Sequence, residues 1–287
     1  MLKRLVNLTV SVLVGTTDWL SDRVNRLVGG QPRRTGIVLT YHSVTAEERA
    51  AFGRQMDLLL RSAHPVAADI EALPSTGGNY AALTFDDGLQ CIVDNVLPEL
   101  ESRRLPCTLF IVTEVLGGHP GWQVFGPEDP STADVMSGEQ LQKLPPDLVA
   151  IGSHTMTHPV LPTVDEQHLR EELLGSRMKL EKLLNRKVRL LSFPYGAFND
   201  EVIEMCRNTG YERFFSALPI RGFRESHEFL TGRVGVSARD WPVEFRLKLA
   251  GAYRWLPYAF AWKRRIRQVL GGRVTPKMEL RTGEKLA

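Results

Sequence analysis

The middle of this 287-residue chain contains five short apolar runs, GIVLTY, AALTF, CTLFIV, LVAIG and RLLSF. Each run is typical of a buried strand, and segments with the apolar spacing of helices lie between them. Strands that alternate with helices favour parallel β/α units over a sandwich. The chain is also long enough for a β/α barrel, which commonly needs about 250 residues. The sequence therefore predicts an α/β fold with a parallel sheet that can close into a barrel.

Polar side chains follow four of the predicted strands at the point where each strand ends. They are His42, the pair Asp86-Asp87, His154 and Tyr195. In a β/α barrel the carboxyl ends of the strands form one rim, and that rim holds the active site. We therefore expect these side chains to lie close together.

Two of the motifs carry residues that bind metal ions. In LTFDDG, Asp86 and Asp87 have two explanations, a turn at the end of a strand or a site in which one acid binds an ion and the other handles protons. In SHTMTHP, His154 and His158 are four residues apart. Two imidazoles and one carboxylate suit Zn²⁺ and leave a coordination position open for water. The same ligands accept Co²⁺, Ni²⁺ or Fe²⁺.

The motifs TFDDG, SHTMTHP and FPYG, in this order, resemble those of the NodB-homology polysaccharide deacetylases, the fourth carbohydrate esterase family. The similarity spans residues 36–236. It implies a distorted (β/α) barrel of about seven strands and metal-dependent removal of acetyl groups from N-acetylated sugars of a polysaccharide or glycolipid. By this resemblance Asp86 is the general base, and the metal ligands are Asp87, His154 and His158.

The resemblance also assigns the groups that stabilise the transition state. The backbone N–H of Tyr195 would hold the oxyanion, together with the metal. One branch of the family has an early strand that ends in Tyr-His, and that histidine is the general acid. Because GIVLTYHSV resembles this variant, His42 is the candidate acid, and a structural role is the alternative.

One position departs from the family pattern. The arginine that usually orients the base, just before the Pro-Tyr motif, is replaced by Ser192, and Arg189 is three residues away from that position. This departure, together with the lack of a convincing copy of the late Leu-x-x-His segment that supplies the acid in many family members, leaves open a degenerate barrel that binds glycan without cleaving it. A glycoside hydrolase is a further alternative, but it needs two carboxyl groups about 5–9.5 Å apart and does not explain the histidines.

Aromatic and acidic residues outside these motifs have less specific explanations. Trp122 and Phe125 lie in a long loop, where they would either stack on sugar rings or pack within the loop. The pair Asp240-Trp241 imitates another motif of the family, but it lies beyond the last expected strand.

The two ends of the chain are basic although the net charge is only +3. Residues 1–34 contain six Lys or Arg and two Asp, and residues 246–287 contain eleven Lys or Arg and two Glu. We predict an amphipathic helix and basic linker over 1–34, a deacetylase domain over 35–245 and a basic amphipathic extension over 246–287. Such ends indicate peripheral contact with a membrane, and the alternative for the C-terminal helix is packing against the barrel with its basic side in water. If the ends bind lipid, a lipid-linked saccharide becomes a candidate substrate besides an acetylated glycan. No recognition motif for nucleic acid accompanies the charge.

Three scattered cysteines, Cys91, Cys107 and Cys206, indicate neither a disulfide framework nor a cysteine zinc site. Reduced thiols favour the cytoplasm, with peripheral contact at the inner membrane. The first residues, MLKRLVNLTVSVLVG, have the charged start and apolar run of a signal peptide but lack a small-x-small cleavage site. An extracytoplasmic protein with an uncleaved N-terminal anchor is therefore the alternative.

Overall fold

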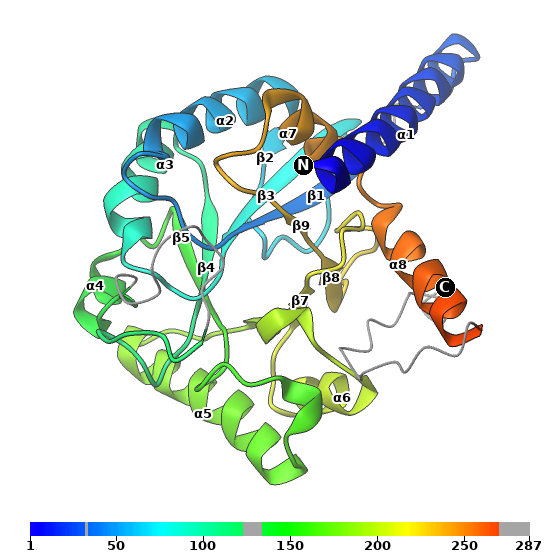
Figure 1. Ribbon diagram of the computed structural model, residues 1–287. Coiled ribbons are helices and arrows are strands. Elements are labelled where there is room, and N and C mark those ends of the chain that lie inside the picture. The colour runs from blue at the N-terminus through cyan, green and yellow to red at the C-terminus, as the bar shows by residue number, and fades with distance from the viewer. Residues whose placement is uncertain (32–33, 123–133, 270–287) are drawn as a thin grey trace.

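The computed structural model describes residues 1–31, 34–122 and 134–269. A parallel sheet, nearly closed into a barrel, is surrounded by helices (Figure 1). The strands are β1 (Arg34–Tyr41), β2 (His64–Pro65), β3 (Gly78–Phe85), β4 (Cys107–Ile111), β5 (Val149–Ser153), β6 (Leu190–Ser192), β7 (Arg213–Ser216), β8 (Leu230–Gly232) and β9 (Val234–Gly235). The α-helices are α1 (Leu2–Leu27), α2 (Arg49–Ser62), α3 (Leu97–Arg103), α4 (Gly138–Lys143), α5 (Glu166–Leu184), α6 (Asp200–Asn208), α7 (Pro242–Leu249) and α8 (Leu256–Val269). A π-helical turn at Ile92–Val96 and 3₁₀ turns at Leu161–Thr163 and Pro194–Gly196 complete the elements.

The order of the strands shows how the barrel closes. The sheet runs β8-β7-β6-β5-β4-β3-β1-β9, with β2 beside β3, and the neighbouring strands are parallel. β8 and β9 lie at opposite ends of this order, yet only Arg233 separates them in the sequence. The segment 230–235 therefore crosses the seam of the barrel and places Arg233 within it. The distorted (β/α) barrel predicted from the sequence is confirmed.

Alternate residues of the strands belong to two separate apolar clusters. Ile37 and Leu39 of β1 join the large core that includes buried residues of the surrounding helices. Val38 belongs to a smaller cluster with Ala82 of β3 and other strand residues. Successive side chains of a strand point to opposite faces, so the smaller cluster lies inside the barrel. His42 and Asp86 are each four residues beyond Val38 and Ala82, so their side chains also point into the barrel, at its carboxyl rim.

Helices α5 and α6 begin directly after a residue that caps them with its side chain. The Asp165 side chain accepts a hydrogen bond from the His168 backbone N–H at the start of α5. Asn199 accepts one in the same way from the N–H of Val202 at the start of α6. These side chains satisfy N–H groups that have no partner within the helix.

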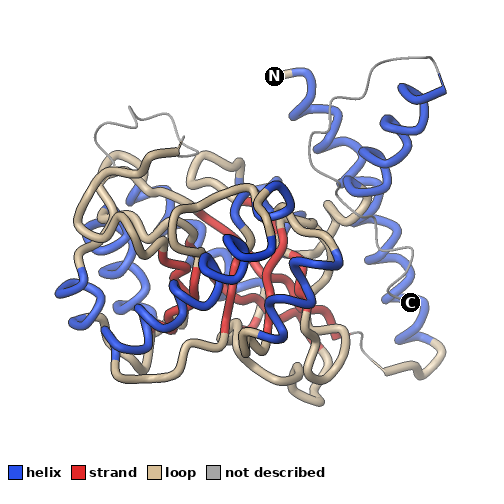
Figure 2. The backbone as a smooth tube through the Cα atoms, turned by 90° about the horizontal axis from the view of Figure 1, so that it is seen from below, coloured by secondary structure: helices blue, strands red, loops and turns tan. Residues whose placement is uncertain are grey.

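The predicted terminal helices are present as α1 and α8, and both lie beyond one side of the barrel (Figures 1 and 2). α7 runs across residue 245, where the sequence predicts the end of the deacetylase domain, and Phe245 and Leu249 of this helix are buried in the core. The three-part division of the chain stays a prediction. Within the described residues, no helix combines the length and the apolar character that crossing a membrane requires.

Candidate metal centre

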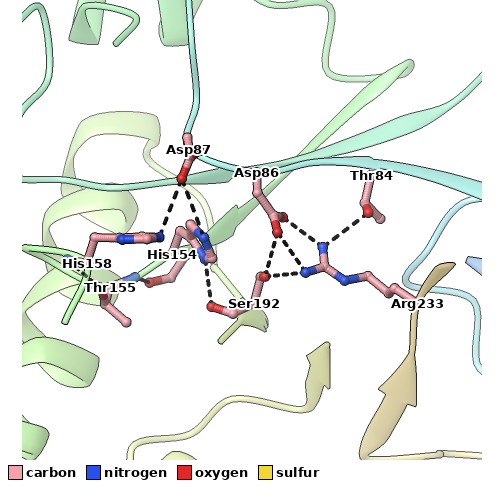
Figure 3. A network of polar contacts seen from close by, with 9 residues as sticks. Thr84, Asp86, Asp87, His154, Thr155, His158, Ser192 and Arg233 are labelled. Carbon is pink, nitrogen blue, oxygen red and sulfur yellow. Dashed lines mark hydrogen bonds and ion pairs between the residues drawn. The ribbon is translucent and has the colours of Figure 1, made fainter. Parts of the chain in front are cut away.

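Three predicted ligands converge at the carboxyl rim of the barrel. Asp87 follows β3, and His154 and His158 lie in the loop between β5 and α5. One ligand atom from each residue lies within 4.8 Å of the others, and the three side chains are buried. Asp87 Oδ1 is 3.7 Å from Nε2 of His154 and 3.5 Å from Nε2 of His158 (Figure 3). The two imidazoles thus face one carboxylate oxygen across a gap that fits an ion.

Hydrogen bonding leaves the ligand atoms without other partners. Nδ1 of His154 donates to the carbonyl oxygen of Ser192 at 2.8 Å, so the lone pair of this ring is on Nε2, toward Asp87. The buried Oδ1 of Asp87 and Nδ1 of His158 have no hydrogen-bond partner. Buried polar atoms are almost always paired, and an orphaned carboxylate oxygen next to two imidazoles is explained by a bound cation. The donor set therefore fits a divalent metal ion.

Burial favours the neutral form of the two imidazoles, which is the form that binds a metal ion. Burial lowers the pKa of His154 to about 4. Burial, with the charge of His154, lowers the pKa of His158 to about 2. Both rings are therefore neutral near pH 7, as metal coordination requires. Burial, and then the negative charge of Asp86, raise the pKa of Asp87 to about 7, and they outweigh the opposing effects of Trp122 and Arg233.

The loop that carries the two histidines has a strained backbone. Thr155 and His158 have φ angles of 70° and 63°, and Asp87 has a φ of 70° in the turn after β3. Such left-handed conformations are uncommon for residues with a side chain and persist where the surroundings hold them. Here Ser153 Oγ accepts from the N–H of Thr155, and Thr155 Oγ1 accepts from the N–H of His158.

A buried acid on α5 also holds this loop. Glu172 Oε2 accepts from the backbone N–H groups of Met156 and Thr157 at 2.7 and 2.9 Å. Its Oε1 accepts from the hydroxyl of Thr157 and lies 3.3 Å from Nε2 of His168. Glu172 is 2% exposed, and none of the motifs in the sequence predicts its role. The signal for it would have been a charged residue beside Leu169 and Leu173 on the buried side of the helix.

The other acid of the pair, Asp86, lies beside the ligands and directs its carboxylate toward Arg233 and Ser192 (Figure 3). Nη1 of Arg233 donates to Asp86 Oδ1 and Nη2 donates to Oδ2, both at 2.7 Å. Nη2 also donates to Ser192 Oγ, and Nη1 to Thr84 Oγ1. The two hydroxyls and the carboxylate fix the guanidinium in one plane, and the guanidinium fixes Asp86.

This ion pair decides the charge of Asp86. Burial alone would raise the pKa of the carboxyl, but Arg233, and then His154, lower it well below its usual range. Asp86 therefore stays ionised, whereas its neighbour Asp87 does not have a comparable partner. The sequence pattern misses Arg233 altogether. Arg189, which the sequence offered as a replacement, points outward and pairs with Glu212 at 3.4 Å.

Three further residues lie around the centre. His42 is half-buried, and burial lowers its pKa although the charge of Asp86 acts in the opposite direction. Tyr195, at a φ of 57°, places its ring edge on His158 with 4.6 Å between the centroids. The Trp122 ring stacks on the ring of His158, with 4.4 Å between the centroids and an interplanar angle of 21°. Trp122 is thus part of the centre, and Phe125 lies outside the described residues.

Residues 74–214 match the family model described as polysaccharide deacetylase. The chain belongs to this family. It is 23% identical over 155 residues to YxkH of Bacillus subtilis (strain 168), whose name places it among polysaccharide deacetylases; the match covers 54% of this chain and 50% of YxkH. It is 24% identical over 164 residues to the poly-beta-1,6-N-acetyl-D-glucosamine N-deacetylase of Staphylococcus aureus, covering 54% of this chain and 53% of that protein. The chain therefore spans about half the length of the curated relatives it matches.

Two solved structures share the fold of this family member. The deacetylase PplD of Streptococcus pyogenes, in complex with acetate, has a TM-score of 0.62 at 16% identity, covering 75% of this chain and 98% of PplD. IcaB from Ammonifex degensii has a TM-score of 0.60 at 22% identity, covering 77% of this chain and 99% of IcaB. At these identities the similarity establishes the barrel.

Proposed function

We propose that this deacetylase-family barrel is a metal-dependent hydrolase that removes acetyl groups from N-acetylated sugars of a polysaccharide. The observation that carries the proposal is the buried group of Asp87, His154 and His158, in which the carboxylate oxygen that faces both imidazoles has no other partner. Family membership and the relatives named as deacetylases of acetylated glucosamine polymers support the substrate class.

A divalent ion held by Asp87, His154 and His158 would acidify a water molecule and polarise the acyl carbonyl. Zn²⁺ is the ion we expect, because these ligands suit it and leave a position open, while Co²⁺, Ni²⁺ or Fe²⁺ would fit the same set. Asp86 lies beside the ligands and is kept ionised by Arg233, so it is ready to accept the proton of the attacking water.

Two other groups would act on the substrate itself. We assign His42 as the proton donor to the leaving nitrogen. It directly follows β1, its side chain points into the barrel, and it is close enough to Asp86 for that charge to raise its pKa. The backbone N–H of Tyr195 would hold the oxyanion, and the ring contact with His158 keeps this turn beside the ligands.

A purified-protein assay with Zn²⁺ and soluble acetylated chito-oligosaccharides or β-1,6-linked glucosamine oligomers tests the proposal. We expect acetate release by the parent, retained metal but no activity in Asp86→Asn, and loss of both in His154→Ala. His42→Ala should slow the reaction by about 10²- to 10⁴-fold.

The other outcomes separate the alternatives. New reducing ends in place of acetate would indicate a glycoside hydrolase, and binding without either product would indicate a degenerate glycan-binding barrel. Activity equal to that of the parent in Asp86→Asn or His154→Ala would contradict the assigned roles.

For the cellular location we propose the cytoplasm, with peripheral contact at the inner membrane, where a lipid-linked saccharide would be a second substrate. The structure places Cys91, Cys107 and Cys206, all within its described residues, outside any disulfide, which supports a reducing compartment. The alternative is an extracytoplasmic protein with an uncleaved anchor. Fractionation of cells that express a tagged full chain, with protease protection of intact spheroplasts, distinguishes the two sides of the membrane.

A further inference from the structure

Helix α1 is attached to the rest of the protein by its polar side. Arg4 forms an ion pair with Glu244 at 2.6 Å, and the Trp255 indole N–H donates to Ser11 Oγ at 3.0 Å. Asp18 accepts from Arg254 at 2.6 and 2.8 Å. Positions 4, 11 and 18 are seven residues apart, so all three side chains lie on the same side of the helix. That side is polar, and it faces α7 and the segment before α8.

The opposite side of α1 is apolar and exposed. Its large side chains, with their exposed fractions, are Leu2 77%, Leu5 42%, Val6 51%, Leu13 63%, Leu20 50%, Val24 59% and Leu27 86%. A surface helix of a globular protein normally buries its apolar stripe and exposes its polar one. α1 does the reverse, and none of the described residues buries this stripe. Figure 1 shows the helix extending beyond the barrel.

Aromatic and basic side chains accompany the stripe. Trp19 is 57% exposed, and the guanidinium of Arg23 lies 4.9 Å from the centre of its ring. On α8, Tyr258 and Trp262 are each 69% exposed, and Lys263 is exposed beside them. Exposed Trp and Tyr next to Lys and Arg are typical of segments that lie at the interface of a membrane.

The charge of these two helices identifies the partner. α1 and α8 together contain eight Lys or Arg and two acidic residues. Both acids are paired, Asp18 with Arg254 and Asp22 with Arg26. A second copy of the chain would bring like charges together, whereas anionic lipid head groups would neutralise them. We propose that the apolar stripe of α1, aided by the exposed aromatic and basic residues of α8, binds the surface of an anionic lipid membrane.

Membrane binding would place the candidate active site near the lipid. The Arg4 side chain donates to the Arg239 carbonyl oxygen at 3.0 Å and lies 4.3 Å from the centre of the Trp241 ring. Both partners follow β9, at the rim of the barrel that holds Asp86. The Arg4 end of α1 is therefore fixed to this rim. A membrane-bound α1 would hold the site close to glycans that are attached to lipid or emerge at the membrane.

The test compares two matched double variants of the full chain in a vesicle flotation assay. The α1 variant, Leu13→Asn with Leu20→Asn, removes apolar surface from α1. The control variant, Leu60→Asn with Met178→Asn, removes apolar surface from α2 and α5, where these two side chains are 44% and 59% exposed and so match Leu13 and Leu20. We expect the parent to bind phosphatidylcholine vesicles containing phosphatidylglycerol more tightly than pure phosphatidylcholine vesicles. The α1 variant should bind at least about tenfold more weakly, and the control variant should match the parent.

Three results would overturn the proposal. They are no binding of the parent to the anionic vesicles, equal binding by the two variants, and a parent dimer in analytical ultracentrifugation that only the α1 variant dissociates. The last result would assign the stripe to a second copy. Acetate release from soluble oligosaccharides should be the same in all three proteins, so failure of membrane binding and failure of the proposed activity are distinguishable.

Discussion

The Asp86 carboxylate and the Arg233 guanidinium form a buried pair with both ions about 2–3% exposed. Taking two ions out of water is costly, and the cost is offset only where hydrogen bonds satisfy the remaining atoms. Ser192 and Thr84 supply those bonds here, at 2.7 and 3.2 Å from the guanidinium. A hydroxyl at position 192 is thus compatible with an arginine that comes from the seam between β8 and β9, which explains the departure from the family pattern.

Loss of one member of this pair should destabilise the protein strongly. Arg233→Met leaves Asp86 buried and unpaired, and we expect it to lower the free energy of unfolding by about 3–5 kcal/mol. Urea unfolding followed by circular dichroism measures the loss. Arg233→Met combined with Asp86→Leu removes both charges and should recover most of it. A double variant as unstable as the single one would show that the pair does not account for the effect.

The cysteines should differ in reactivity because burial suppresses the thiolate. Burial raises the pKa of Cys107 to about 12 and the pKa of Cys206 well above its usual range. The thiolate is the reactive form, so at pH 8 only about one Cys107 in 10⁴ is ionised. Cys91 is partly exposed. With Ellman's reagent at pH 8 we expect one thiol to react in the native protein and three in denaturant, and Cys91→Ser should abolish the native reaction. Rapid native labelling of Cys107, identified by mass spectrometry, would contradict this.

The loop between β5 and α5 is an element whose shape depends on a helix residue outside it. Between its two ligands, His154 and His158, the backbone has a positive φ at Thr155. Glu172 accepts three hydrogen bonds from the next two residues, Met156 and Thr157. The motif predicts the loop and its histidines from local spacing. It does not predict Glu172, because a glutamate in a charged helix is most often a solvated residue.

Removal of Glu172 should weaken metal binding more than it weakens the fold. In Glu172→Ala the N–H groups of Met156 and Thr157 lose their acceptor, and we expect the affinity for Zn²⁺ to fall by about 10- to 100-fold, as for other groups that orient metal ligands. Competition with a chromogenic chelator measures the affinity. Glu172→Gln keeps one acceptor oxygen and should recover part of it.

Glu228 supplies a matched control for that experiment. Its carboxylate accepts from the backbone N–H of Phe223 at 2.7 Å and from the hydroxyl of Thr231 at 3.1 Å, in the segment before β8, at the opposite end of the barrel from the ligands. Glu228→Ala should lose thermal stability without losing metal affinity. An equal loss of affinity in both variants would mean that Glu172 acts only through general stability.

For the molecule as a whole, the sequence predicts the barrel and the convergence of its strand-end residues, and it does so from local patterns. The pair Asp86-Asp87 and His154 directly follow strands, and His158 lies four residues after His154, so a parallel barrel brings the ligands together whatever its details. Arg233 reaches Asp86 from 147 residues away, through the closure of the seam between β8 and β9. Only the isolated charge in the apolar run LTGRVGV signals that a buried partner is required. The exposed apolar stripe of α1 is likewise not predicted by local patterns. The periodicity of its residues predicts an amphipathic helix, but it does not show which side of the helix contacts the rest of the protein.

Because the ligands come from two separate segments of the barrel, metal binding should stabilise the entire fold. A ligand that binds only the native state, at 100 times its dissociation constant, adds about 2.7 kcal/mol. For a protein of this size this raises the melting temperature by roughly 5–10 °C. We expect that shift between protein dialysed against a chelator and the same protein with Zn²⁺ restored, measured by differential scanning fluorimetry. His154→Ala removes a ligand from β5 and should abolish the shift, whereas Asp86→Asn, which leaves all three ligands, should retain it. An undiminished shift in His154→Ala would place the stabilising ion elsewhere, since two remaining ligands would not bind Zn²⁺ with unchanged affinity.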